Sequence, residues 1–296
     1  AGFLRRIVGF FYRIFLSQQI GAEGMGVYQL IFPVFGICFS LCCGPVQTAV
    51  SRYVAAQSAF PKRSRTAGSY LPEAALKAGL LLSFSLACVC AVILYTGSEW
   101  LADRVLLEAR CGQLLRLMSL TVPVCSLHCC ISGYYYGLQK ASVPAFAQLA
   151  EQAARVLSVF LVCSVLSAEG QKPTAAVAVW GMVCGELASL LFTGTAFLLR
   201  RQKSVGGGAF LGYVSKIFAL AAPLAATRLC ISLLQSAEAV LIPSRLQLHG
   251  MTDSQALSVY GVLTGMAHPF ILFPTAVINS VAVMLLPDMA QSQSAG

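Results

Sequence analysis

The stretch AALKAGLLLSFSLACVCAVILY (Ala74–Tyr95) contains 22 residues, and Lys77 is the only charged one among them. A helix that crosses a membrane needs about 20 consecutive apolar residues, so this stretch predicts one. The whole chain has the same character, with 57% hydrophobic residues, 10% charged residues and a mean hydropathy of +0.76. Soluble domains carry about 25% charged residues. The composition therefore excludes a soluble enzyme, a disordered protein and a collagen-like fibre, and the long apolar runs favour helices over a barrel.

Similar apolar runs recur along the 296 residues and predict an all-α polytopic membrane protein. The first run is expected to be truncated, and the seventh is long enough to tilt or to extend past the bilayer. Eight helices are predicted, over residues 1–18, 27–54, 74–95, 114–138, 143–166, 174–199, 213–243 and 256–286.

The loops between these helices alternate in charge. The loops after helices 2, 4 and 6 are basic, whereas the opposite loops are mixed or acidic. Because cytoplasmic loops of membrane proteins collect lysine and arginine, these three loops are predicted to be cytoplasmic. Their basic residues are Lys62, Arg63, Arg65, Lys140, Arg200, Arg201 and Lys203.

A glycine-rich segment divides the chain. Residues 201–211 include Gly206, Gly207 and Gly208 and predict a cytoplasmic linker. It separates a six-helix N-terminal lobe, 1–200, from the first two helices of a C-terminal lobe, 212–296. Both ends of the sequence indicate a fragment, so the complete protein is expected to have twelve or more helices in two six-helix lobes.

A short internal match supports two lobes. At an offset of 232 residues, Arg13 falls on Arg245 and Leu16 on Leu248. The same offset places Val27-Tyr28 on Val259-Tyr260 and Gln47-Thr48 on Asn279-Ser280. Transporters are often built from such repeats. Helices 7 and 8 would then repeat helices 1 and 2 in the same orientation.

Ionisable residues inside membrane spans usually face a cavity or a partner. Arg6 and Arg13 are seven residues apart on one face of helix 1, although either one could instead extend to the membrane interface. Glu151 and Arg155 are one helical turn apart and can form an ion pair, which could line a cavity or lock the packing.

Further polar groups lie in other spans. Glu186 is the only charged residue in the middle of helix 6, and Arg228 and Glu238 belong to a polar stripe on helix 7. Arg52 ends helix 2 and could line a cavity or anchor the helix at the interface.

Arginines outnumber acids in helices 1 and 7, and the net charge of the chain is +9. Because guanidinium groups hold phosphates through paired hydrogen bonds, a hydrated cationic cavity suits an anionic diphosphate headgroup. The sequence shows no basic face interleaved with aromatic residues, so nucleic-acid binding is not expected. The sequence has no phosphate-binding glycine loop and no hydrolase motif, so no enzyme activity is expected.

Twelve cysteines are present, mostly inside apolar runs. None shows a CxxC or Cys/His spacing typical of zinc sites. They are therefore interpreted as packing residues, and no metal or other cofactor is expected.

Several motifs carry a resemblance to a known family. They resemble the stage V sporulation protein B group, which belongs with polysaccharide and lipid-linked oligosaccharide flippases and is related to lipid II flippases and to multidrug/toxin extruders. The matching segments are GFFYRIFLS (9–17), IGAEGMGVYQ (20–29), TAVSR (48–52), GYYYG (133–137) and EQAARV (151–156).

The resemblance implies two six-helix lobes around a central cavity, alternating access, and a bacterial plasma-membrane location. The family motif Arg-x-x-Gly-Phe matches residues 6–10, so Arg6 is the best match to a cavity arginine. Arg13 stands one position from the family's second arginine, and the acidic residue early in helix 2 has no counterpart here. The expected cargo is a lipid-linked glycan with an anionic diphosphate, moved within the lipid bilayer in spore-envelope or cell-wall assembly. The coupling ion, Na⁺ or H⁺, stays open.

Two other functions remain. A multidrug/cation antiporter of the same superfamily requires an acidic interior. A membrane scaffold for envelope synthesis requires no transport at all.

Overall fold

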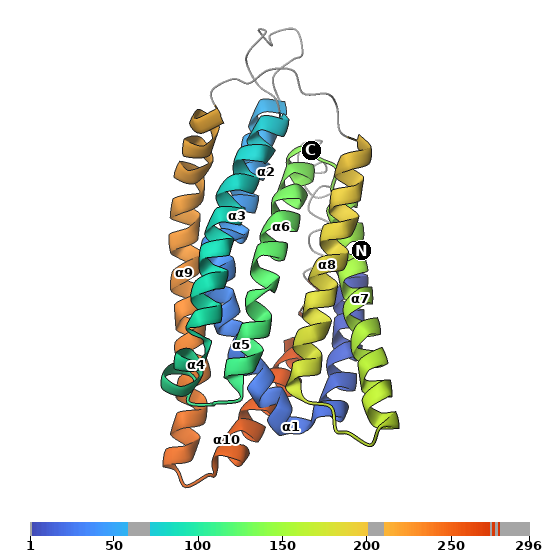
Figure 1. Ribbon diagram of the computed structural model, residues 1–296, viewed down its shortest axis with the longest axis vertical. Helices are drawn as coiled ribbons and strands as arrows, with labels where there is room; N and C mark the ends of the chain where they lie inside the picture. The colour runs from blue at the N-terminus through green and yellow to red at the C-terminus, as the bar shows by residue number, and fades with distance from the viewer. Residues whose placement is uncertain (1, 59–71, 201–209, 273, 276–277, 279–296) are drawn as a thin grey trace, which may run out of the picture.

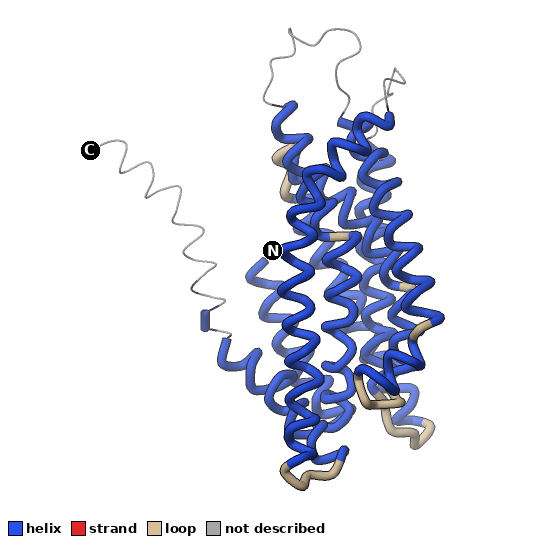
Figure 2. Tube along the Cα trace, turned by 90° about the vertical axis from the view of Figure 1, so that its left-hand side faces the viewer, coloured by secondary structure: helices blue, strands red, loops and turns tan. Residues whose placement is uncertain are grey.

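The computed structural model describes residues 2–58, 72–200, 210–272, 274–275 and 278, and all regular secondary structure in them is helical. Figure 1 shows long helices side by side along one axis, and Figure 2 shows short connections at both ends of this bundle and at breaks within it. The elements are α1 (Gly2–Cys42), α2 (Gly44–Ser58), α3 (Pro72–Thr96), α4 (Ser98–Trp100), η2 (Leu101–Val105), α5 (Cys111–Ser119), α6 (Thr121–Gly137), α7 (Ser142–Ala168), α8 (Ala175–Arg200), α9 (Phe210–Leu248), α10 (Asp253–Tyr260) and η3 (Gly261–Ala267).

The described residues contain five runs that are long and apolar enough to cross a membrane, or six if the bent pair α5–α6 counts as one span. One of the five, Ile7–Ala56, is 50 residues long. At about 1.5 Å per residue, it is far longer than a bilayer core of about 30 Å. The chain is thus an all-α, multi-pass membrane protein, as predicted.

The 50-residue run is folded back on itself at Gly21, which has φ +72° and ψ 178°. A residue with a Cβ is strained at such a φ, whereas glycine is not. The predicted helices 1–18 and 27–54 are therefore two arms joined by one glycine, without the loop that the sequence indicated. In Figure 1 the first arm of α1 descends from the N-terminus, and the second arm climbs toward α2.

Helix boundaries differ from the predictions in two other places. The predicted helix 114–138 begins at Cys111 and bends by 40° between α5 and α6. The bend lies beside Pro123, whose missing N–H removes a helical hydrogen bond. The predicted helix 213–243 extends over Phe210–Leu248. The end of the predicted eighth helix lies outside the described residues.

The faces of the helices separate lipid from interior. α7 and α9 leave large apolar side chains exposed, such as Phe160 and Leu234, as helices in hydrocarbon do. Several polar side chains turn inward instead. The Ser40 and Ser232 hydroxyls, for example, are 2.8 Å apart between α1 and α9.

Helix α9 packs along α1, α2 and α3, and α10 and η3 pack along α1. The predicted linker, 201–211, lies almost entirely outside the described residues. The division into a lobe at 1–200 and the start of a second lobe at 212–296 therefore stays a prediction.

Candidate functional site

A cationic cavity of about 390 Å³ lies between the two arms of α1 and α7. Three arginines line it, and none of its lining residues is a carboxylate. Its walls are Arg5, Gly9, Tyr12, Arg13, Leu16, Met25, Tyr28, Gln29, Phe32, Gln148, Gln152 and Arg155.

Arg155, on the α7 wall of this cavity, forms an ion pair with Glu151. The Arg155 Nη2 donates to Glu151 Oε1 at 2.6 Å, and the Arg5 Nη2 lies 3.9 Å from the same oxygen. The Arg155 Nε is buried and has no hydrogen-bond partner among the described residues. The spacing of Glu151 and Arg155 predicted this pair, and the structure has it. Arg155 also lines the cavity, so its guanidinium contributes positive charge there.

A second cavity of about 300 Å³ adjoins the first and shares Arg5, Phe32 and Arg155 with it. Glu186 of α8 lines it, and the Glu186 Oε2 lies 2.6 Å from the His128 Nε2 of α6. The predicted cavity residue Glu186 therefore lies close to the Glu151–Arg155 pair.

An apolar groove of about 490 Å³ opens on the other side of the first arm of α1. Phe10 and Ile14 of α1 line it opposite Phe270 and Ile271, and the Phe10 and Phe270 rings are 5.8 Å apart. Arg13 lines both this groove and the cationic cavity. One arginine thus stands between a polar compartment and an apolar one.

The polar stripe of α9 lines a third cavity, of about 600 Å³, together with the second arm of α1 and η3. Glu238 and Gln235 of α9 face this cavity, as do Thr264 and His268. Glu238 therefore lines a cavity, but not the cationic one. This third cavity and the cationic cavity share Gln29 and Phe32.

The remaining predicted residues lie elsewhere. Arg228 is exposed on α9, and its guanidinium covers Gly44 at the junction of α1 and α2. Arg52 is exposed in the middle of α2 (Gly44–Ser58) and lines none of these cavities. Arg6 lies in α1, but its side chain is outside the described part of the structure.

Two residues that the sequence analysis did not select contribute to the site. Arg5 lines both the first and second cavities, on the helical face of Gly9 and Tyr12. The spacing of four and seven residues from Arg5 was a signal for it. His128 pairs with Glu186 from a different helix, and no spacing within one helix indicates that contact. With Cys125 and Cys129 it also forms a group of possible metal ligands, although no metal site was expected.

A family model and a solved structure are similar to this chain. The family model described as "Polysaccharide biosynthesis protein" matches residues 1–293. One similar solved structure is the "Inward-facing conformation of a multidrug resistance MATE family transporter of the MOP superfamily". It matches with a TM-score of 0.60 and 13% sequence identity, and the match covers 90% of this chain and 60% of the chain in that structure. The fold of this chain is thus that of a membrane transporter.

Two curated relatives come from Bacillus subtilis (strain 168). "Stage V sporulation protein B" is 24% identical over 98% of this chain and 56% of its own length. "Sporulation protein YkvU" is 20% identical over 99% of this chain and 63% of its own length. The chain spans less than two thirds of each. The match of the family model over nearly every residue shows that the chain belongs to the polysaccharide biosynthesis protein family.

Proposed function

We propose that this chain forms part of a membrane exporter that flips lipid-linked oligosaccharide or polysaccharide precursors across a bacterial plasma membrane by alternating access. The observation that carries the proposal is the position of Arg13 between the cationic cavity and the apolar groove. Family membership and the transporter fold support an export function.

The two compartments match the two halves of such a lipid. A diphosphate headgroup needs hydrogen-bond donors and positive charge, which Arg5, Arg13 and Arg155 supply in the cavity. A prenyl chain needs apolar surface, which Phe10 and Phe270 supply in the groove. The headgroup would cross through the polar interior while the chain stays in contact with lipid.

The same charges argue against the antiporter of organic cations. A site for cations needs carboxylates, and the cavity between α1 and α7 is lined by three arginines and no carboxylate. Glu151 and Glu186 line the adjoining cavity instead, where Glu151 is already paired with Arg155 and Glu186 with His128.

Lipid binding tests the proposal directly. The protein in nanodiscs is titrated with a prenyl diphosphate, with the matching prenyl alcohol and with tetraphenylphosphonium. We expect the diphosphate to bind most tightly. A charge-assisted hydrogen bond is worth about 1.5–3 kcal/mol, so Arg13→Gln should weaken binding by roughly tenfold or more. The matched control is Arg116→Gln, because Arg116 pairs with Glu99 outside the cavities.

Three outcomes separate the candidate functions. Preference for the phosphonium would favour the cation antiporter. Equal binding of diphosphate and alcohol would remove the role of the arginines. A scaffold would bind none of the three compounds. Its function in cells would also be unchanged when Arg5, Arg13 and Arg155 are replaced by glutamine.

A further inference from the structure

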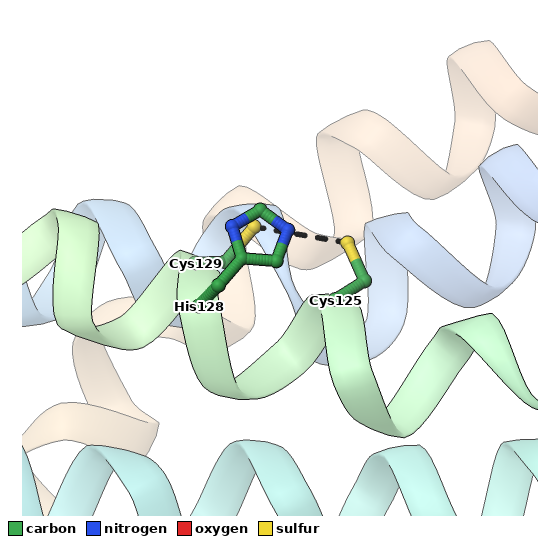
Figure 3. A group of neighbouring side chains, drawn as sticks. All are labelled: Cys125, His128 and Cys129. Carbon is green, nitrogen blue, oxygen red and sulfur yellow. Dashed lines mark hydrogen bonds between the residues drawn. The ribbon is translucent and has the colours of Figure 1, made fainter. Parts of the chain in front are cut away.

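One face of α6 carries three side chains that ligate metals. Cys125, His128 and Cys129 follow one another at positions i, i+3 and i+4, so they lie on the same face of the helix. Figure 3 shows the three side chains together on this face of the helix. Their ligand atoms all lie within 4.8 Å of one another. Each residue is at most 9% exposed. Two sulfurs and one imidazole are therefore close together, and one ring nitrogen of His128 would exchange its α8 partner for a metal.

The two sulfurs already have the separation that a tetrahedral metal requires. Zinc binds thiolate sulfur at about 2.3 Å, and two such bonds at a tetrahedral angle place the sulfurs about 3.8 Å apart. The Cys125 Sγ and Cys129 Sγ are 3.8 Å apart. A zinc ion could bridge them without any movement of α6.

Helix α8 holds the imidazole in place. The His128 Nε2 lies 2.6 Å from Glu186 Oε2, and the His128 Nδ1 lies 3.3 Å from Ser189 Oγ. If one ring nitrogen binds a metal, the other keeps its partner on α8. A carboxylate or hydroxyl that hydrogen-bonds the second nitrogen is the usual way in which proteins orient a metal-bound histidine.

Charge balance favours a divalent ion. Two thiolates and one neutral imidazole carry two negative charges, so Zn²⁺ makes the set neutral, whereas Cu⁺ leaves a net negative charge beside Glu186. An uncompensated charge at a buried site is costly. The two thiol protons would leave as zinc binds. The cavity of about 300 Å³ that these residues line offers an entry path and room for a fourth ligand.

We propose that Cys125, His128 and Cys129 form a zinc site in which Glu186 acts as a positioning residue for the imidazole. Bound zinc would join the sulfurs of α6 to the α8 carboxylate through His128. Nothing in this site depends on the cargo, so it can exist whether or not the protein flips lipids.

Metal titration of the purified full chain in detergent tests this site. Co²⁺ serves as the probe, because its thiolate charge-transfer absorption reports sulfur ligation, and Zn²⁺ is then added to displace it. We expect one equivalent to bind. The double variant C125S/C129S should lose this absorption, and its affinity for Zn²⁺ should fall at least tenfold. The variant H128Q should keep the sulfur absorption with weaker binding.

Cys130 gives the matched control. It is fully buried on the same helix, but its thiol faces the Gly79 carbonyl of α3 at 3.5 Å. C130S should therefore bind Co²⁺ as the original chain does. Unchanged Zn²⁺ affinity in the double variant, or an equal loss in C130S, would overturn the proposal.

X-ray absorption of the zinc-loaded original chain needs no variant, so it remains decisive if a substitution prevents folding. Two sulfurs and at least one nitrogen at the zinc are expected. Ligation by sulfur alone, or by oxygen and nitrogen alone, would rule the site out. Lipid binding uses no metal, so failure here would leave the proposed function standing.

Discussion

At the scale of single residues, the Glu151–Arg155 pair is the clearest case of a contact that sequence spacing predicts. The two side chains are 7% and 19% exposed and 2.6 Å apart. Removing one partner of a fully buried pair costs about 3–5 kcal/mol, because the other charge stays buried. This pair borders a cavity, so Arg155→Met is expected to cost less, about 2–3 kcal/mol. Thermal unfolding in detergent measures it.

A double variant tests the reason for that loss. Arg155→Met leaves the buried Glu151 carboxylate with only Arg5, 3.9 Å away, as an ionic partner. If the cost arises from this poorly paired carboxylate, Glu151→Gln with Arg155→Met should be more stable than Arg155→Met alone. Arg116→Met is the control, since its pair with Glu99 is 44% and 72% exposed and such pairs contribute about 0–1 kcal/mol. A double variant less stable than Arg155→Met would contradict this explanation.

Other residue contacts could not be predicted from the sequence. Glu186 was selected because it is charged, but its partner His128 is 58 positions away on another helix. In a membrane protein both the lipid-facing and the buried sides of a helix are apolar, so hydrophobic periodicity does not reveal which faces meet. Arg6 was selected for its spacing from Arg13 and its match to the family motif, whereas the cavity-lining Arg5, one position earlier, was not selected.

At the scale of helices, a close crossing joins the second arm of α1 to the junction of α10 and η3. A Cβ on Gly26 would collide with the Leu257 carbonyl, and a Cβ on Gly261 would collide with the Ala22 carbonyl. Backbones approach this closely only where small residues meet. The crossing therefore depends on both glycines.

Gly261→Ala is expected to push α10 away from α1 and to cost about 1–3 kcal/mol, the usual penalty for overpacking. Gly194→Ala is the matched control, because Gly194 lies in helix α8 with nothing within 4 Å of an added Cβ. That change should leave stability equal or slightly higher, since alanine favours helices over glycine by about 1 kcal/mol. Equal melting temperatures for both variants would disprove the crossing.

The apolar runs predicted the helices well, and their connections less well. A gap in hydropathy between residues 18 and 27 indicated a loop, but helix continues there except at Gly21. Hydrogen bonds of the backbone persist through polar residues such as Glu23, and one glycine suffices to reverse the chain. Composition alone does not distinguish a loop from a turn inside a helix.

At the scale of the whole molecule, an ionic cluster ties together segments that are far apart in the sequence. Arg110 contacts Glu23 at 2.8 Å and Glu108 at 2.7 Å, and the Ser254 hydroxyl donates to Glu23 at 2.7 Å. The cluster connects the turn of α1, the loop before α5 and the start of α10. It lies at the opposite end of the bundle from the last turns of α2 and α8 (Figure 1).

This cluster predicts a pH dependence. The hydrogen bond from Arg110 holds the pKa of Glu108 below its ordinary value. Its stabilisation is therefore present above the pKa of an unfolded glutamate and is lost as pH falls through the lowered pKa. Between about pH 6 and pH 3, the free energy of unfolding should fall more for the original chain than for Glu108→Gln. The difference between the two should be less than about 1 kcal/mol, because Arg110 is exposed. High salt should reduce the difference. An equal fall of stability with pH in both proteins would show that the Glu108–Arg110 pair contributes nothing to stability.

The internal repeat also belongs to this scale. The first arm of α1 and α9 run in the same direction in Figure 1, and each is followed by a glycine with positive φ, Gly21 or Gly250. The matched dipeptides Val27-Tyr28 and Val259-Tyr260 lie beside Gly26 and Gly261, where the second arm of α1 crosses the junction of α10 and η3. A repeat in parallel orientation requires this arrangement, although it remains a prediction.

Topology gives the last prediction. The ends of α2, α6 and α8 lie together in Figure 1, at one end of the bundle, and the basic loops follow them in sequence. With Cys230 replaced by serine, Lys140→Cys should react with an impermeant maleimide only after the cells are permeabilised. Asp253→Cys, at the start of α10, should react in intact cells. Both positions are exposed. The reverse pattern would place the basic loops outside, against the bias that orients membrane helices, and would turn the Arg110 cluster toward the cytoplasm.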